Sequence, residues 1–504
     1  MVLDKKFDLI VIGSNVGAYI SAALSAKRGL SVLLIDNLEA RYTYNCDGFK
    51  FDFIPQYSAW FYPERLFDKI FQELSLSINE QAEIRKMGAT YQVITQKSRI
   101  DISDNFSVLK NEIKREFPDH ASSIMLFYKE LMQYYDVTNS LLEKDFLFPP
   151  TTFQEKSAYQ RILHSHSYSG LKKFKTLEDF LANFNLNNTE FEIFIKAQIH
   201  LFSFTYSSQP SFIQAVRILG NIMRRTCYMD GGYQELKALL RRKLLNFGGE
   251  IKNDACIDEF IYRKGKLSGL RLSSYEGIVY STYILSALEI NDFLKLLGKK
   301  LKRNYSKKTK TLLKEYGLFT INFGLNESVI PVGMKDRLAY VVNEKKPLLN
   351  ENLILCTLSH EKDNIKAPSG KRILTASCIV PYRHLTQDAE RLIKIKDRVI
   401  FNLKKIIPFF EENILTVYPK ESNYFKYLSE RNSDPGDVSQ PKSQFIYRKL
   451  KSSYLGITAI SNRTQEKNLF FTGREVLPDI GYEGEIFSCY KIANHLYKEI
   501  KKFS

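Results

Sequence analysis

The chain has 504 residues, a length that suits two or three domains better than one small core. Hydrophobic residues make up 44% and charged residues 26%, and these ordinary proportions exclude an intrinsically disordered chain. The net charge of +17 has two interpretations, a biased codon usage of the source or attraction to an anionic membrane surface, and charge alone does not choose between them.

The cysteines and the apolar runs indicate a reduced protein of the cytoplasm. The apolar run Phe7–Ile12 is too short for a signal peptide and leads directly into a glycine turn. No stretch of about 18 uninterrupted apolar residues is present, so we expect any membrane contact to be peripheral, at the inner face of the membrane. The cysteines lack the spacing of a zinc site or a disulfide framework, so we expect free thiols and no metal: Cys46, Cys227, Cys256, Cys356, Cys378 and Cys489.

The beginning of the chain has the pattern of a βαβ unit. Near-continuous apolar runs predict strands over Phe7–Ile12 and Ser31–Ile35, as in a parallel sheet that is covered on both faces. A helix is predicted between them over Ala18–Lys27, with Gly29 as its stop.

The turn between the first strand and the helix is the first motif that carries chemistry. Its sequence is Gly13-Ser14-Asn15-Val16-Gly17-Ala18, and such a turn lets backbone N–H groups and the helix N-terminus approach a pyrophosphate. Asp36 ends the second strand, where an acid accepts hydrogen bonds from an adenosine ribose. Asn15 and Ala18 replace two of the three usual glycines, and Asn tolerates a positive φ better than most residues. An ordinary strand-to-helix loop is the alternative interpretation of a lone glycine turn.

Helical spacing dominates the next part of the chain. Segments such as Arg65–Leu74 and Ala121–Leu141 carry apolar residues on one helical face, so we expect a helical insertion from Pro63 to Ile222. Near Gly231 the pattern returns to α/β. The elements predicted there are a helix over Gln234–Asn246, a strand at Glu250–Ile251, a hairpin turning at Lys264–Lys266, a strand over Val279–Ser286, strand-like runs to about Val380 and a loop over Ser433–Ser443.

Two polar features each have a functional and a plain interpretation. The Lys-rich stretch Leu294–Lys314 is either a solvated helix face or a patch that faces an anionic membrane. It lacks the aromatic interleaving of nucleic-acid modules, so we exclude nucleic acid as the main partner. His164 and His166 are either two ligands on one strand face or part of a polar loop.

Three further motifs stand in the order of a known superfamily. The first is Gly48-Phe49-Lys50-Phe51-Asp52-Phe53-Ile54-Pro55, the second opens at Tyr228-Met229-Asp230-Gly231-Gly232-Tyr233 and extends to Leu288, and the third runs from Asn468 through Gly473 and Gly484 to a terminal helix. Together with the opening turn, they resemble the phytoene desaturase and amine oxidase superfamily, whose members are FAD-dependent oxidoreductases.

The resemblance implies an α/β fold with a Rossmann-like FAD-binding domain assembled from discontinuous segments, a mixed-sheet substrate domain and a helical insertion. The expected segments are residues 1–60 for the first FAD-binding part, 61–222 for the helical insertion and part of the substrate domain, 223–290 for the second FAD-binding part, 291–445 for the sheet and helices of the substrate domain and 446–504 for the third FAD-binding part.

The resemblance also implies FAD as the cofactor and assigns residues to its parts. Gly13, Asn15, Gly17 and Ala18 would lie near the pyrophosphate, Asp36 near the ribose, the backbone of Ile257 at the adenine, Gly473 and Arg474 at the phosphates and ribityl chain, and Gly484, Glu485 and Ile486 at the isoalloxazine edge. No catalytic side chain is named, because the flavin itself does the redox chemistry.

The chain departs from the family at three places. The interval from Asp36 to Gly48 contains no glycine, where the family has a Gly-Gly pair. Arg474 stands where the family has a small or acidic residue, and Glu485 where it has an apolar or small one. A carboxylate beside a flavin would disfavour the anionic reduced state, whereas an arginine can bind a pyrophosphate bidentately.

Two hypotheses about function follow. The first is an FAD-dependent oxidoreductase resembling phytoene desaturases and carotenoid isomerases, acting on a lipophilic isoprenoid or carotenoid-like substrate. The second is a binding protein that has lost or weakened FAD binding, as in the Rab GDP dissociation inhibitors, which resemble this architecture and bind prenylated partners without redox chemistry. A substrate tunnel would be lined by the helical insertion and the strands from about 318 to 380. Its candidate aromatics, for which core packing is the alternative role, are Trp60, Phe61, Phe202 and Phe204.

Overall fold

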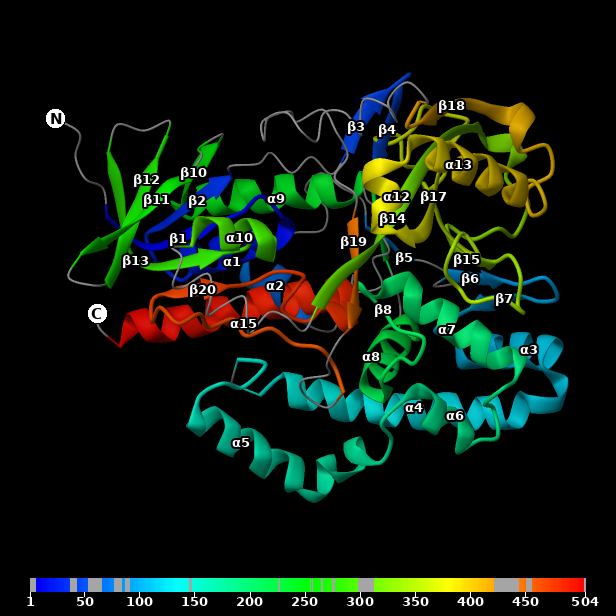
Figure 1. Ribbon diagram of the computed structural model, residues 1–504, viewed down its shortest axis with the longest axis horizontal. Helices are drawn as coiled ribbons and strands as arrows, with labels where there is room; N and C mark the ends of the chain where they lie inside the picture. Colours follow the sequence, from blue (N-terminus) through cyan, green and yellow to red (C-terminus); the bar gives the residue numbers. More distant parts are fainter. Residues whose placement is uncertain are drawn as a thin grey trace.

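The computed structural model describes residues 6–36, 43–52, 66–76, 84–86, 91–144, 147–224, 227–253, 255, 257–263, 266–273, 277–297, 312–420, 444–449 and 456–502. Within these residues the strands form a seven-stranded sheet, a nine-stranded sheet and two small two-stranded sheets. Figure 1 shows the seven-stranded sheet at one end of the molecule and the nine-stranded sheet at the other. A layer of helices runs along one side of both.

The seven-stranded sheet is built from the start, the middle and the end of the chain. β1 (Lys6–Ile12) lies parallel between β2 (Val32–Asp36) and β13 (Ile278–Ser286). β10 (Glu250–Asn253) extends the sheet beyond β2, and β20 (Leu469–Phe471) pairs with β13. The prediction that three distant segments converge in one domain is therefore confirmed, and so is the α/β fold class.

The predicted hairpin is also present. β11 (Ile257–Arg263) and β12 (Lys266–Leu272) are antiparallel, and β12 joins the start of β13. Leu9, Ile10, Val11 and Ile12 of β1 are fully buried, which explains why the strand reads as one continuous apolar run.

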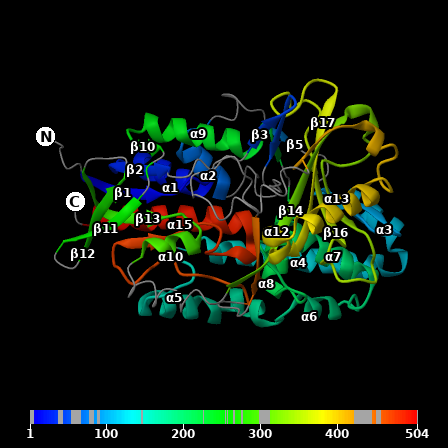
Figure 2. The same cartoon turned by 45° about the horizontal axis from the view of Figure 1, so that its top comes forward.

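Three helices pack on each other beside this sheet. α1 (Val16–Lys27) contacts both α9 (Gly232–Asn246) and α15 (Gly481–Lys501), and Figure 2 shows α9 and α15 on either side of α1. Their apolar residues form one cluster with α2 (Leu66–Glu73) and the buried side chains of the central strands. The helix after the opening turn is thus held by the middle and the end of the chain at once.

The nine-stranded sheet is mixed and lies apart from the first. Its order is β7, β6, β15, β16, β17, β14, β19, β8, with β18 beside β14. α12 (Tyr382–Gln387) and α13 (Ala389–Leu403) accompany it, and α13 packs in the core of one face. The strands are β6 (Tyr91–Ile94), β7 (Arg99–Ile102), β8 (Thr205–Tyr206), β14 (Leu312–Asn326), β15 (Arg337–Val341), β16 (Leu353–Leu358), β17 (Lys371–Pro381), β18 (Ile414–Tyr418) and β19 (Gln444–Lys449).

Two strands of this sheet were not foreseen. The stretch expected to hold the helical insertion and part of the substrate domain contains β6 and β7, and β6 pairs with β15 of the nine-stranded sheet. β19 pairs with β14, so the segment from residue 446 that was assigned to FAD binding begins in the other sheet. The sequences of β6 and β19 do not by themselves identify them as strands. Only their pairing with distant segments of the chain does. The small sheets pair β3 (Thr43–Cys46) with β4 (Phe49–Asp52), and β5 (Ile84–Lys86) with β9 (Cys227–Met229).

The helical part covers residues from 106 to 222 and has an aromatic core. Its helices are α3 (Phe106–Glu116), α4 (Ala121–Leu142), α5 (Phe153–His164), α6 (Leu177–Ala182), α7 (Glu190–Phe202), and α8 (Phe212–Ile222). His164 is the last residue of α5 and its Nδ1 lies 2.8 Å from the Gln160 carbonyl, so the histidine pair does not lie on a strand. None of the described helices is both long enough and apolar enough to span a bilayer.

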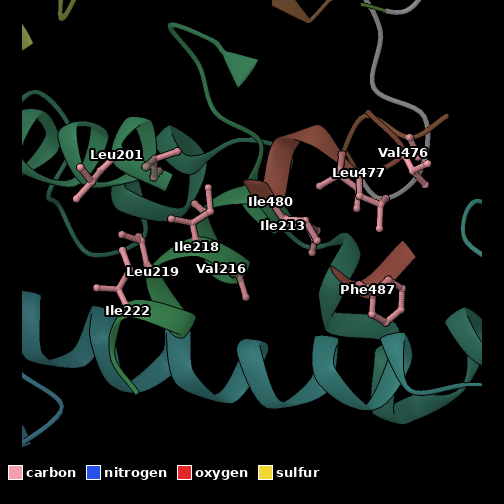
Figure 3. Close-up of a cluster of buried hydrophobic side chains, with 14 of the residues drawn as sticks. Leu201, Ile213, Val216, Ile218, Leu219, Ile222, Val476, Leu477, Ile480 and Phe487 are labelled. Atoms are coloured by element: carbon pink, nitrogen blue, oxygen red, sulfur yellow. The ribbon is translucent and has the colours of Figure 1, made fainter. Parts of the chain in front are cut away.

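The helical part is anchored to the end of the chain by apolar contacts and one buried ion pair. Figure 3 shows Ile213 and Val216 of α8 near Leu477, Ile480 and Phe487, which belong to the segment around the start of α15. At the same junction the guanidinium of Arg217, 3% exposed, forms a two-pronged ion pair with Glu483 of α15. The same side chain donates to Thr138 of α4 at 3.1 Å.

Breaking this pair should destabilise the junction. Arg217→Met leaves the Glu483 carboxylate without its cation in a largely dry contact, so we expect the free energy of unfolding to fall by about 3–5 kcal/mol. Urea unfolding measures the loss. Lys69→Met removes an ion pair with Glu143 whose side chains are 54% and 63% exposed, and should cost less than about 1 kcal/mol. Equal losses in the two variants would contradict the anchoring role.

Candidate functional site

The opening turn is capped by its own asparagine. Gly13 has φ 147° and donates its N–H to the Ile35 carbonyl at 3.0 Å. Asn15 is the N-cap of α1, and its Oδ1 accepts the Ala18 N–H at 2.8 Å. The φ angle of Asn15 is −82°, so asparagine serves here as a helix cap and not as a residue that tolerates a positive φ. The Asn15 Nδ2 donates to the Ala287 carbonyl at 2.7 Å, which ties the turn to the end of β13.

The closing turn reaches the same point from the other end of the chain. The N–H of Thr472 donates to the Ser286 carbonyl at 2.8 Å. The next residue, Gly473, has φ 116°, and its N–H donates to Ser488 Oγ of α15 at 3.2 Å. A side chain built on Gly13 or on Gly473 would point at Ala287, 3.1 Å and 3.9 Å away. The two glycine turns therefore flank one residue of β13.

Gly17 is the point where α1 and α15 touch. A Cβ on Gly17 would lie 2.5 Å from Cys489 Sγ and 3.2 Å from Glu485 Oε1. Real Cβ atoms do not approach that closely, so only glycine lets the first turn of α1 meet α15 at Glu485 and Cys489. This contact brings the opening turn and the closing part of the chain together, and a groove shared by the two turns stays a prediction.

Glu485 brings a carboxylate to the start of α1. The side chain is 3% exposed, and the Gly17 N–H donates a hydrogen bond to it. Burial raises the pKa of this carboxyl, while Arg474 and the Gly17 N–H act in the opposite direction. A helix N-terminus stabilises an anion through its unpaired N–H groups and its dipole. Glu485 thus occupies the place where the turn would bind a phosphate.

Arg474 faces this carboxylate without touching it. Burial alone would lower the pKa of Arg474, but the charges of Glu485 and Glu289 raise it above its ordinary range. The guanidinium lies over the ring of Phe204, 5.5 Å from its centroid. Among the residues that the structure describes, Arg474 forms no hydrogen bond and no direct ion pair, so its donors are available to a bound anion.

Asp36 provides the other end of the site. Its carboxylate is 4% exposed, with Oδ2 accepting the Tyr19 hydroxyl at 2.7 Å and lying 3.2 Å from Lys237 Nζ. Its Oδ1 is buried and has no hydrogen-bond partner. An acceptor in that state suits a ribose hydroxyl, which is a donor. The sequence analysis did not find Tyr19 or Lys237, although Lys237 interrupts the apolar face of α9 beside Leu236.

The remaining predicted residues have structural surroundings that leave their ligand roles as predictions. Ile257 opens β11, four residues after Asn253, which is the register partner of Asp36. Ile486 is buried in the cluster that joins α15 to α1. At Gly484 any side chain would overlap the Leu477 carbonyl, so this glycine permits the close turn before α15.

Of the four aromatic residues proposed to line a substrate tunnel, the two that the structure describes do not form one group. Phe204 packs on Tyr482, with ring centroids 4.8 Å apart, and so lies beside Arg474. Phe202 packs edge-on against Tyr91 in the core. Trp60 and Phe61 lie outside the described residues, as does most of the Lys-rich stretch.

A cavity that no sequence motif indicated lies between β4, the start of α9 and the nine-stranded sheet, and charged and hydroxyl side chains stand in its wall among apolar ones. At its wall Lys366 Nζ lies 2.5 Å from Asp52 Oδ2, and burial raises the pKa of Asp52 against the effect of that lysine. The lining residues are Asp52, Tyr228, Met229, Gly232, Asp336, Arg337, Thr357, Leu358, Ser359, Lys366, Ile373 and Thr375.

The two ends of the site differ in how they suit a dinucleotide. The adenosine end fits, because Asp36 Oδ1 is an unsatisfied buried acceptor. The phosphate end does not fit as it stands, because Glu485 takes the Gly17 N–H and Asn15 takes the Ala18 N–H. Arg474 supplies the one cation that faces this end within the described residues.

The sequence itself is similar to plant enzymes over most of its length. A prolycopene isomerase of Daucus carota is 24% identical over 469 residues, which cover 87% of this chain and 73% of that protein. The Arabidopsis thaliana prolycopene isomerase is 24% identical over 429 residues, covering 82% and 71%. The chain is a distant homologue of the prolycopene isomerases. No protein-family model matches it.

Solved structures place this homologue on the scaffold of FAD-dependent oxidoreductases and amine oxidases. An oxidoreductase of Methanosarcina mazei superposes with a TM-score of 0.62 at 17% identity, covering 97% of this chain and all of that one. A putrescine oxidase bound to putrescine has a TM-score of 0.56 at 12% identity, covering 98% and 99%. A Rab GDI of Plasmodium falciparum has a TM-score of 0.58 at 12% identity, with the same coverage. The chain thus shares its fold with these three proteins.

The contact at Gly17 can be tested by mutation. Gly17→Ala should lower the free energy of unfolding by about 1–3 kcal/mol, because the new methyl group overlaps Cys489 Sγ and forces α1 and α15 apart. In a Cys489→Ala background the sulfur is gone, so the same substitution should cost much less. A double-mutant cycle by urea unfolding measures the difference. An unchanged cost in that background would show that the two helices do not meet there.

Proposed function

We propose that the chain is an FAD-dependent oxidoreductase or isomerase that acts on a lipophilic substrate of the isoprenoid or carotenoid class. Two facts support the class of reaction and substrate: the sequence similarity to prolycopene isomerases and the flavoprotein scaffold. Prolycopene is a lipophilic polyene, and a related polyene is the substrate we propose here.

The observation that carries the cofactor assignment is the meeting of the two glycine turns at Ala287, with Asp36 at the edge of the same sheet. In this proposal Asp36 Oδ1 accepts a ribose hydroxyl and Arg474 binds the pyrophosphate bidentately. Phe204 and Tyr482 form an aromatic wall beside Arg474. When bound, FAD would supply the reversible electron transfer that oxidation or double-bond rearrangement requires.

A second function is favoured by one specific observation. The first N–H groups of α1 that a pyrophosphate needs are held by Glu485 and Asn15. A protein in this state could use the scaffold to bind a lipid or a partner without a cofactor, and the similarity in fold to a Rab GDI agrees with that use.

The net charge and the proposed substrate both favour contact with a membrane surface. A lipophilic substrate is delivered from a membrane, and a chain with a net charge of +17 is attracted to anionic lipid headgroups. We therefore propose peripheral contact with the anionic inner face of the membrane in the cytoplasm.

FAD binding separates the two functions. We expect the purified protein to carry flavin absorbance, or its apoprotein to bind added FAD with quenching of the flavin fluorescence. Asp36→Asn should weaken FAD binding about tenfold, because a charge-assisted hydrogen bond to the ribose becomes a neutral one. Asp8→Asn, which alters a carboxylate that caps the Ser31 N–H on the same sheet, is the control and should leave FAD affinity unchanged.

The activity has its own assay. The FAD-loaded protein with reduced flavin or an electron acceptor should convert cis-polyenes such as prolycopene, measured by separation of the geometric isomers and desaturation products. An apoprotein that refuses FAD under all conditions would reject the enzyme and leave the cofactor-free binding protein.

A further inference from the structure

Three of the side chains at which the opening and closing motifs depart from the family lie close together. Asn15 caps the Ala18 N–H, Glu485 takes the Gly17 N–H, and Arg474 faces Glu485 from the closing turn. Asn15 comes from the start of the chain and the other two from its end, and the fold brings them together at the start of α1.

The arrangement reproduces the electrostatics of a bound phosphate. A helix N-terminus and an arginine are the two features that bind a pyrophosphate. Here Glu485 Oε1 lies beside Gly17 at the start of α1, and the charge of Arg474 acts on the same carboxylate. The carboxylate is buried, so it gains little from water and depends on these partners.

We propose that Glu485 is an internal anion that takes the place of the dinucleotide pyrophosphate, so that FAD enters only when this carboxylate is neutralised or swings away, and Arg474 then passes to the phosphates. The inference rests on the proposed function for the identity of the nucleotide. The internal anion itself is a property of the chain.

Proton uptake follows from the position of Glu485. The groups that face it are Arg474 from the closing turn, Tyr482 and Cys489 from its own helix, and the Gly17 N–H of α1 with the neutral Asn15 amide beside it. Burial already raises the pKa of this carboxyl, and a nearby pyrophosphate raises it further. FAD should therefore bind with uptake of a proton and more tightly as the pH falls, by up to about tenfold per pH unit.

The test is titration of the apoprotein with FAD, ADP and adenosine by calorimetry, from about pH 6 to about pH 8.5. Glu485→Gln should bind FAD and ADP about tenfold or more tightly than the unaltered chain above neutral pH, because it removes a like charge from the phosphates. It should also lose the pH dependence. Adenosine, which has no phosphate, should bind equally to both. Glu499→Gln, an equivalent change near the far end of α15, is the matched control and should behave like the unaltered chain.

The outcomes separate this inference from the proposed function. If the unaltered chain binds no FAD while Glu485→Gln or Glu485→Val does, the internal anion stands and the enzyme hypothesis fails. If all of them bind FAD equally, with the same pH dependence, the internal anion is rejected and the enzyme hypothesis stands. If none binds FAD or ADP, both fail. Thermal melting checks that the variants are folded, and Glu485→Val, which restores the apolar residue of the family, serves if the glutamine variant is not.

Discussion

The close approach of α1 and α15 at Gly17 is the constraint on which the site depends. Without a side chain at that position, the first turn of α1 can rest on the second and third turns of α15, at Glu485 and Cys489. The same approach sets both glycine turns against Ala287 and closes the seven-stranded sheet with β20. The opening and closing turns lie side by side only because these two distant segments are held at this distance.

Charge determines which ligand groups can bind at the start of α1. The start of α1 favours an anion, and in this chain the anion is supplied from within by Glu485. Arg474 adds a cation that has no direct ion pair among the described residues, so its charge is available to a bound anion. Asp36 at the other end still has an unsatisfied oxygen. The adenosine end of the site is thus open to a ribose hydroxyl, whereas Glu485 already occupies the phosphate end. This difference between the two ends is the reason why both an FAD enzyme and a cofactor-free binding protein are considered.

Much of the fold could be predicted from the sequence, because buried parallel strands, the glycine stops and the hairpin are local patterns. Strand β1, helix α9 and the β11–β12 hairpin were all placed within a few residues. Strands β6 and β19 were not, because their identity comes from partners far along the chain. The residues of the two turns could be chosen from motif order. The position of Glu485 could not, because it depends on the rotation of α15 against α1, which no local pattern encodes. The same holds for Tyr19 and Lys237, which only the packed helices bring to Asp36.

The most direct test is a crystal structure of the protein grown with ADP or FAD. The account predicts the pyrophosphate at the start of α1, within hydrogen-bonding distance of the Gly17 N–H and of Arg474, with the Glu485 carboxylate moved off that N–H and a ribose hydroxyl on Asp36. A nucleotide bound at this turn with Glu485 still on Gly17, or a nucleotide bound elsewhere in the molecule, would contradict it.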